Sequence, residues 1–322
     1  MKMLLTDHAR IGSYCSEQLS VAQSHAWHQA RLKRMRELAE LAVKLNAGYL
    51  ALTGKLLGNT RIPESLIDSL FSLAAGQPIL HFLVFLTDSE YRRLSYRKDY
   101  PKNLHLIRLR SKDDYIDEQI ALRISDDTIE LQLADHPSVF VHCRKMGDSV
   151  IEVNEKAFSI PCFEPLGFDD AARQGFGILS LEWDDNTVPI IKQIPMQYYA
   201  FREAKLELSP AETQREILQK LRQSAAKLER NTFLRLTICG RTAFGITMDA
   251  AAMKQKLEKQ VFFAQVFDTT EMDIDAESFE TDISLSSEFV RLALSDDTLS
   301  DAERSRLICR GWNALGGKAV SE

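Results

Sequence analysis

The stretch Tyr49-Leu50-Ala51-Leu52-Thr53-Gly54-Lys55 decides the fold of this chain. The apolar run predicts a buried strand that opens into a loop at its glycine. Many hydrolases place a glycine and then an acidic residue at this end of a parallel strand, where the acid binds a metal ion. Here Lys55 occupies the acidic position. The stretch therefore predicts the scaffold of such an enzyme without one of its metal ligands.

Helices and strands alternate around this strand. A long helix is expected within residues 18–46, because apolar residues recur on one face and Asn46-Ala47-Gly48 can form a left-handed cap. Residues 63–75 predict a second helix, residues 79–86 an apolar strand, and residues 104–110 another strand. This alternation indicates a mainly parallel sheet with helices on its faces.

The chain changes character from about residue 120, where short strands predict hairpins that extend the first sheet or stack on it. Ser209, Pro210 and Glu212 then match the start of a helix that leads into a strand over residues 233–239, and together these predict a small separate domain. Acidic residues beyond Asp268 predict a solvated linker before two closing helices. The expected parts are residues 1–196, 197–268 and 269–322.

The composition excludes several classes of protein. With 322 residues, 45% of them hydrophobic and 27% charged, the chain matches an ordinary globular protein. No apolar run reaches the ~18 residues that a membrane span needs, and the first residues lack the pattern of a signal peptide. We therefore expect a cytoplasmic protein without a membrane partner. The five scattered cysteines favour free thiols over a disulfide framework or a zinc cluster.

The net charge of −6 hides an uneven distribution. Eight basic residues stand against two acidic ones between Glu90 and Lys112. A basic stretch of this kind is expected where a protein contacts a phosphate backbone, although a solvated helix face is the alternative. The candidate DNA-binding residues are Arg92, Arg93, Arg97, Lys98 and Lys102.

In order and spacing, these elements resemble the calcineurin-like metallophosphoesterases, and more closely the SbcD and YhaO type of DNA-repair exonuclease subunit. The resemblance is carried by Asp7-His8-Ala9 after the first strand, by residues 31–38 of the long helix and by Tyr100-Pro101-Lys102-Asn103-Leu104-His105-Leu106. Residues 233–242 resemble the core of the YhaO-type capping domain. The resemblance implies an α/β fold with a two-sheet sandwich flanked by helices, a small α/β capping domain and a helical C-terminus.

The family binds two divalent cations, and its ligands can be compared with this chain position by position. Asp7 fits the first aspartate, but Ala9 stands where the first histidine should be, and Lys55 replaces the bridging aspartate. Asp88 and His142 are the other vestigial candidates. An ammonium group at the bridging position repels both cations and has no lone pair to offer. The resemblance thus implies a sheet edge without metal, where Lys55 lies within salt-bridge reach of Asp7.

The favoured hypothesis is a catalytically degenerate SbcD-type subunit with no assigned catalytic residue and no cofactor. It would act in DNA repair or defence and bind DNA, an SMC-like ATPase of the SbcC type, or both. The resemblance places the ATPase contact on the closing helices, within residues 284–294 and 300–315. The candidate partner-binding residues are Phe289, Leu292, Leu307 and Trp312.

Two alternatives stay open. The chain could be an active Mn²⁺-dependent exonuclease or phosphodiesterase, with His8, His136 and His142 joining Asp7 or Asp88 in an atypical ligand set. It could instead be a pure protein-interaction module that forms a homodimer through the helix within residues 18–46.

Overall fold

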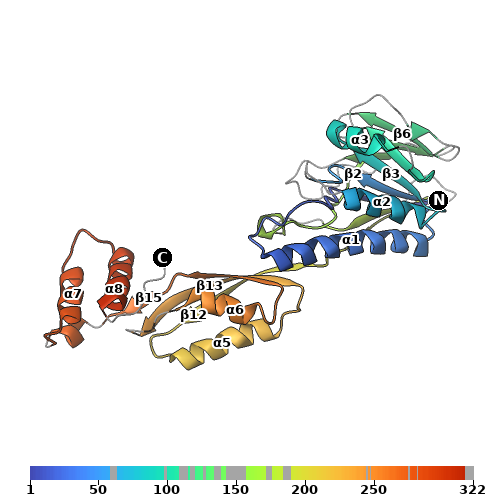
Figure 1. Ribbon diagram of the computed structural model, residues 1–322. Coiled ribbons are helices and arrows are strands. Elements are labelled where there is room, and N and C mark those ends of the chain that lie inside the picture. The colour runs from blue at the N-terminus through green and yellow to red at the C-terminus, as the bar shows by residue number, and fades with distance from the viewer. Residues whose placement is uncertain are drawn as a thin grey trace. The chain divides into compact units, whose positions relative to one another are not determined.

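The computed structural model describes residues 1–58, 64–97, 100–108, 115–116, 120–125, 128–133, 139–142, 157–171, 176–183, 190–243, 246, 248–274, 276–280 and 282–315. The chain forms two compact units, Met1–Tyr198 and Tyr199–Glu322 (Figure 1). The first boundary lies close to the one expected after residue 196. Residues 269–322, expected as a third part, belong to the second unit.

The first unit is built on a six-stranded sheet in the order β11-β10-β1-β2-β3-β4. Strands β1 to β4 run parallel, as the alternation of helices and strands predicts, while β10 and β11 continue the sheet in antiparallel pairing. The strands are β1 (Lys2–Asp7), β2 (Tyr49–Thr53), β3 (His81–Leu86), β4 (Leu104–Arg108), β10 (Ile178–Glu182) and β11 (Ile190–Ile194).

Helices cover one face of this sheet because alternate strand residues and one helix stripe are both apolar. Leu50 and Phe82 pack there against Met35 and Leu38 of the longest helix. That helix begins at a capping box between Ser20 and Gln23 and ends before Asn46, whose φ of 56° confirms the expected left-handed cap. The helices are α1 (Val21–Lys44), α2 (Glu64–Ala75), α3 (Asp88–Ser95) and α4 (Phe168–Ala171).

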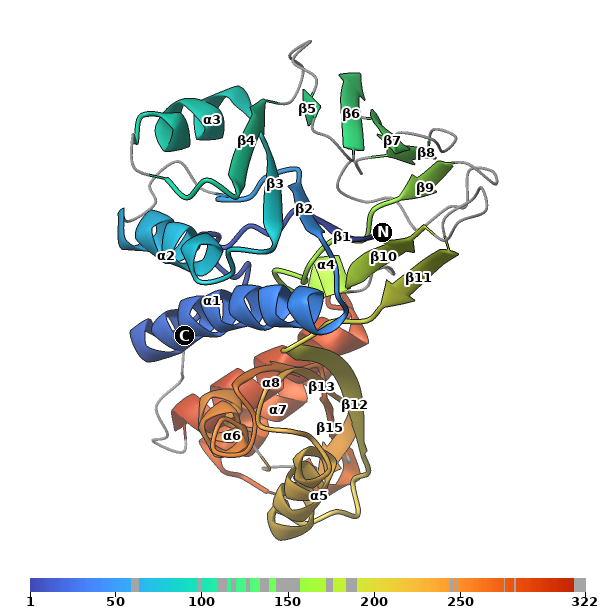
Figure 2. The same ribbon diagram turned by 90° about the vertical axis from the view of Figure 1, so that its right-hand side faces the viewer.

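The opposite face carries the other set of alternating residues, including Leu83, Phe85 and Ile107, in a second core cluster. A five-stranded sheet in the order β5-β6-β7-β8-β9 lies on this side, away from α1 and α2 (Figure 2). The α/β sandwich expected from the sequence is therefore confirmed. The strands are β5 (Tyr115–Ile116), β6 (Ile120–Ser125), β7 (Thr128–Leu133), β8 (Val139–His142) and β9 (Ala157–Ser159).

The second unit has a parallel sheet in which β13 pairs with β12, β14 and β15. Ile217 and Leu221 of one helix and Met253 of another pack against this sheet. Two further helices close the described chain. The elements are β12 (Ala200–Leu208), α5 (Gln214–Ala226), β13 (Thr232–Ala243), α6 (Ala250–Leu257), β14 (Phe263–Asp268), β15 (Glu271–Asp273), the 3₁₀ helix η1 (Ala276–Phe279), α7 (Leu285–Leu294) and α8 (Asp301–Leu315).

The expected start of α5 at Ser209 is wrong. The helix begins after Thr213, whose side chain forms a capping box with Glu216. The segment around Ser209 forms a turn instead, and Glu212 forms an ion pair with Lys220. Both serine and threonine starts match the same local motif, and burial of the helix face against the sheet selects the second one.

The expected solvated linker beyond Asp268 is also wrong at its start. Residues Glu271–Asp273 form β15, which pairs with the end of β13. Arg241 on β13 lies 3.9 Å from Glu271 and 3.6 Å from Asp273, and Met272 between these two acids is buried. Opposite charges flanking a buried methionine explain why this acidic segment forms a strand.

Candidate functional site

The carboxyl end of β1 holds a fully buried carboxylate. Asp7 lies in register with Thr53 of the neighbouring parallel strand, and the Thr53 hydroxyl donates a 2.7 Å hydrogen bond to Asp7 Oδ1. The ring Nδ1–H of His8 donates to Asp7 Oδ2 at 2.6 Å. These two donors fix both oxygens of the carboxylate, and each oxygen keeps a further lone pair.

The backbone around this carboxylate adopts unusual conformations. His8 has a φ of 49°, and its amide donates to the Thr53 carbonyl at 3.0 Å. Gly54 has a φ of 69°, and a Cβ at this position would lie 2.3 Å from Asp7 Oδ1 and 2.7 Å from His8 Nδ1. The site therefore requires glycine at position 54, both for its left-handed backbone and for the close approach of the Asp7 and His8 side chains.

A cysteine completes this cluster. Cys162 forms a parallel β-bridge with Asp7, in which the Asp7 amide donates to the Pro161 carbonyl at 2.9 Å and the Phe163 amide donates to the Asp7 carbonyl at 2.8 Å. One potential ligand atom from each of Asp7, His8 and Cys162 lies within 4.8 Å of the other two. Within the described ranges, no other set of three such side chains converges in this way. Sequence reasoning did not single out Cys162, because this bridge joins distant parts of the chain.

The expected contact between Lys55 and Asp7 is wrong. Lys55 is exposed, whereas both Asp7 oxygens are engaged by Thr53 and His8. Its carbonyl accepts a hydrogen bond from the amide of Arg10, so the backbone of the loop after β2 is paired with the loop after β1. The left-handed turn at Gly54 directs the chain so that the ammonium group stays in water, where its charge costs least.

The other vestigial metal ligands do not join the cluster in the described part of the chain. Asp88 is exposed at the start of α3 and lies 4.0 Å from Arg108. His142 lies at the end of β8 in the second sheet, and its side chain is outside the described set, as is the whole of His136. A different acidic residue of α3 lies in the interior of the first unit. Glu90 is buried and accepts hydrogen bonds from the amides of Leu57 and Thr87, at 2.8 and 3.3 Å.

A buried ion pair, between Arg31 and Glu164, lies beside the loop that follows β1. The guanidinium of Arg31, fully buried on α1, donates to the Ala9 carbonyl at 2.6 Å and lies 3.8 Å from Glu164. Arg34 contacts the same carboxylate at 3.4 Å. Burial raises the pKa of Glu164, and the two guanidinium groups oppose that increase. Nε and Nη1 of Arg31 have no hydrogen-bond acceptor among the described residues. The position expected for a histidine ligand, Ala9, is thus part of a structural contact.

Only some of the candidate DNA-binding residues between Glu90 and Lys112 are exposed in the structure. Arg92 and Lys102 are exposed. Arg97 is engaged instead, with Asp68 at 2.9 Å, and its guanidinium lies over the ring of Phe71. Arg93 is half-buried, and Lys98 falls outside the described residues. The structure therefore leaves Arg92 and Lys102 as the candidates whose exposure fits a phosphate contact.

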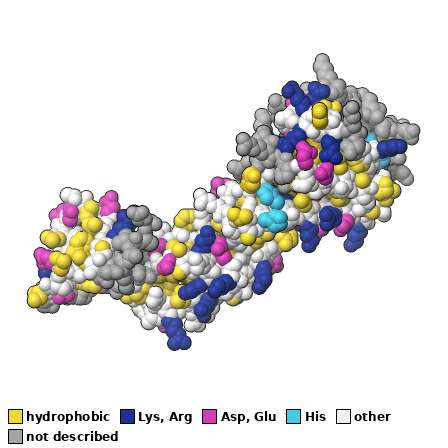
Figure 3. Space-filling view, viewed as in Figure 1, with side chains coloured by type: hydrophobic (Ala, Val, Ile, Leu, Met, Phe, Trp, Pro, Cys, Tyr) yellow, Lys and Arg dark blue, Asp and Glu magenta, His cyan; other side chains and the backbone are white. Residues whose placement is uncertain are grey.

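The four expected partner-binding residues separate into two kinds. Phe289 and Trp312 pack within the α7–α8 pair, where the Phe289 ring leaves no space for a Cβ at Gly311 and the Trp312 ring lies 6.1 Å from that of Phe279. Leu292 and Leu307 instead are 61% and 41% exposed. Three further apolar side chains, at or beside the ends of these helices, are also exposed. These are Ile283, Leu285 and Leu315. Hydrophobic side chains gather over this helix pair in the space-filling view (Figure 3).

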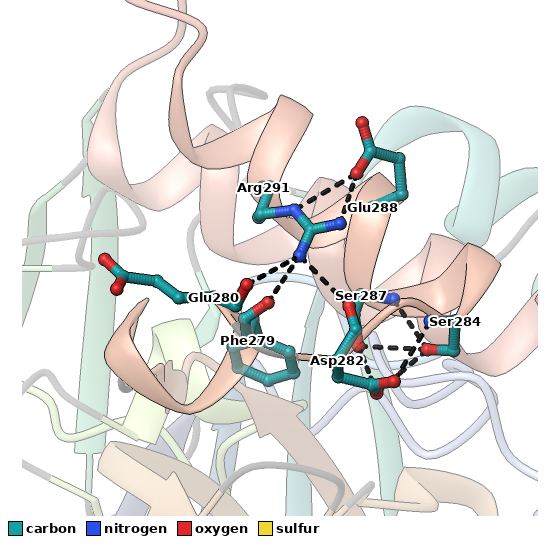
Figure 4. Close-up of polar contacts among 7 residues, drawn as sticks. All are labelled: Phe279, Glu280, Asp282, Ser284, Ser287, Glu288 and Arg291. Atoms are coloured by element: carbon teal, nitrogen blue, oxygen red, sulfur yellow. Dashed lines mark hydrogen bonds and ion pairs between the residues drawn. The ribbon is translucent and has the colours of Figure 1, made fainter.

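The start of α7 is held by a polar network (Figure 4). Arg291 donates to the carbonyls of Phe279 and Asp282, at 2.7 and 3.0 Å, and pairs with Glu288. Ser284 caps the helix by accepting from the amide of Ser287 at 3.2 Å. The network ties η1 to α7, and so fixes the exposed leucines on a defined helix.

Among the described residues, no helix has the length and apolar character needed to cross a membrane. The chain matches none of the protein-family models with which it was compared. The curated proteins contain no sequence match either.

Proposed function

We propose that this chain is a non-catalytic binding subunit that docks onto a helical partner through the exposed apolar residues of α7 and α8. We call Leu285, Leu292, Leu307 and Leu315 the leucine surface. The resemblance to SbcD-type subunits suggests an SMC-like ATPase of the SbcC type as the partner. The observation that carries the proposal is the exposure of these leucines on helices that are already packed together, with Leu285 72% and Leu292 61% exposed.

The spacing of these residues supports a helical partner. Leu285 and Leu292 are seven residues apart on α7, so their side chains project from the same side of the helix. Such a stripe fits the apolar side of an amphipathic helix or a coiled coil. Val290 and Ile308 already fill the interior between α7 and α8, so the leucine surface is not needed for the core of the pair.

The residues at the carboxyl ends of β1 to β3 support a role other than two-metal hydrolysis. Ala9 is buried and its carbonyl accepts from Arg31, Lys55 points to water, and Asp88 lies outside the Asp7 cluster. Two-metal catalysis needs a bridging ligand and enough donors to hold both cations about 3.5–4 Å apart. The described side chains offer neither a bridging carboxylate at position 55 nor a second group of donors.

The test is co-expression of the full chain with the SbcC-type ATPase of the same cell, followed by measurement of the Kd between the purified proteins. Burying an exposed leucine contributes about 1.5–3 kcal/mol, and Leu285 and Leu292 already have part of their surface covered. The variant Leu285→Asp with Leu292→Asp should therefore lose about 3 kcal/mol of binding, which is about a hundredfold in Kd.

The matched control is Ile79→Asp, which changes an equally exposed apolar residue of the first unit, 74% exposed. It should bind as the unchanged chain does, and circular dichroism should be the same for all three proteins. No binding by the unchanged chain, or equal binding by the double variant, would contradict the proposal. So would Mn²⁺-dependent cleavage of linear DNA that disappears in Asp7→Asn.

A further inference from the structure

We propose that Asp7, His8 and Cys162 bind a single Zn²⁺ ion at the carboxyl end of β1. This inference is independent of the docking role, because it concerns the first unit and not the leucine surface. It also differs from a two-cation hydrolase site in its ligands. A carboxylate, an imidazole and a thiolate form a set that zinc accepts, whereas a thiolate disfavours Mg²⁺, Ca²⁺ and Mn²⁺.

The distances are close to those that such an ion requires. Bonds of about 2.0–2.3 Å in a tetrahedral site place donor atoms about 3.3–3.7 Å apart. Here one candidate donor atom from each residue lies within 4.8 Å of the others, and Asp7 Oδ2 and His8 Nδ1 are 2.6 Å apart. Zinc binding would release to solvent the proton that His8 Nδ1 donates to Asp7 and the thiol proton of Cys162, and side-chain movements of about 1 Å would then bring the three donors to bonding distance. The fourth position is left to water or another ligand, as in many open zinc sites.

The backbone holds the two ends of this site together independently of any ion. The β-bridge between Asp7 and Cys162 is closed by hydrogen bonds on both sides, to Pro161 and from Phe163. Directly paired residues of neighbouring strands project their side chains to the same side of a sheet. The carboxylate and the thiol are thus placed next to each other by strand pairing rather than by a mobile loop.

A second layer of contacts orients the carboxylate. The Thr53 hydroxyl donates to Asp7 Oδ1 and is itself fully buried. Outer contacts of this kind fix the direction of a metal ligand, and their loss typically lowers metal affinity 10–100-fold. The backbones of His8 and Gly54 both adopt left-handed conformations, and the His8 imidazole forms a hydrogen bond with the Asp7 carboxylate. A non-glycine residue rarely adopts this conformation, and such strain concentrates at binding sites.

Two of the three donors are partly exposed to solvent. Asp7 is fully buried, but the side chain of His8 keeps 13% of its exposure, and Cys162 is half-buried. The cluster therefore combines one interior anchor with two donors nearer the surface. One ion held in this way would stabilise the junction between β1, the loop after β2 and residues 161–163.

The experiment measures Zn²⁺ binding by the full chain after removal of metal with a chelator, using competition with a chromogenic zinc indicator. Co²⁺ is then added to a separate sample as a spectroscopic probe, because a thiolate ligand gives cobalt a sulfur-to-metal charge-transfer band. We expect the unchanged chain to bind a single ion and to show this band. The variants are Cys162→Ser, His8→Asn and Thr53→Val, and Cys239→Ser is the matched control.

Cys162→Ser should abolish the charge-transfer band. His8→Asn keeps a residue that tolerates the left-handed backbone and should lower Zn²⁺ affinity more than Thr53→Val, for which we expect a 10–100-fold loss. Cys239→Ser, which alters a half-buried thiol of the second unit, should leave both readouts unchanged. Thermal unfolding verifies that each variant is folded. Absence of Zn²⁺ binding by the unchanged chain, or an identical cobalt spectrum in Cys162→Ser, would overturn the proposal.

Discussion

Replacing Arg31 with methionine tests the buried ion pair at the centre of the first unit. The change removes the 2.6 Å hydrogen bond to Ala9 and leaves Glu164, only 5% exposed, with Arg34 as its remaining cationic contact. Removing one partner of a buried pair typically costs 3–5 kcal/mol. Because Arg34 and the amide of Tyr198 still contact Glu164, we expect about 3 kcal/mol, the lower end of that range.

The free energy of unfolding that is lost in Arg31→Met should depend on pH in a defined direction. Burial raises the pKa of Glu164 above its ordinary value, and Arg31 opposes this shift. Without Arg31 the folded-state pKa rises further, so the folded chain holds the proton to higher pH than the unfolded chain does. The stability that protonated Glu164 contributes is fully present below its pKa in the unfolded chain. It is lost as the pH rises through its pKa in the folded chain. The loss caused by Arg31→Met should therefore be larger at neutral pH than near pH 4.5.

The measurement is urea unfolding of the full chain at several pH values, followed by tryptophan fluorescence. Trp27 is a local reporter, because its ring lies 5.3 Å from the Arg31 guanidinium. Adding Glu164→Gln to Arg31→Met removes the unpaired charge, and should recover part of the loss at neutral pH. A loss that is the same at every pH, or that Glu164→Gln deepens additively, would refute the reasoning.

Two further predictions concern the sheet edge and the basic stretch. Gly54→Ala should destabilise the first unit by about 2–4 kcal/mol in the same urea assay. The new Cβ would lie 2.3 Å from Asp7 Oδ1, and alanine disfavours a φ of 69°. The control is Gly48→Ala, because the space around a Cβ at position 48 is open. If Arg92 on α3 and Lys102 before β4 contact a DNA backbone, Arg92→Gln with Lys102→Gln should reduce the slope of log K against log salt by about 2, measured by fluorescence anisotropy. An unchanged slope would exclude these two residues as phosphate contacts.

Local signals in the sequence were sufficient for much of the first unit. The apolar stripe and the left-handed cap at Asn46 define the long helix, and short apolar runs such as residues 49–53 define the parallel strands. These features depend on neighbours within a few turns of chain, so they are visible without tertiary information. The start of α5 shows the limit of such signals, because Ser209 and Thr213 offer the same local motif and only packing distinguishes them.

The candidate site depended on contacts that the sequence does not display. Asp7 was identified by its place after the first strand, but its neighbour Cys162 comes from a bridge between segments far apart in the chain. Lys55 follows the expected glycine, yet the left-handed turn at Gly54 directs it to solvent. Pairing partners and side-chain directions after a turn are set by the assembled sheet, so position along the chain was a poor guide to them.

The long strand β13 has a mechanical consequence for the closing helices. Its first half pairs in parallel with β14 and its end with β15, separated by a short interruption where Thr269 donates to the Ile238 carbonyl at 2.9 Å. The chain continues from β15 into η1 and α7. A pull on α7 along the strand direction would load the hydrogen bonds of β14 and β15 together, in shear, rather than open them one after another. The sheet is therefore suited to resist force applied at the end of the chain that carries the exposed leucines.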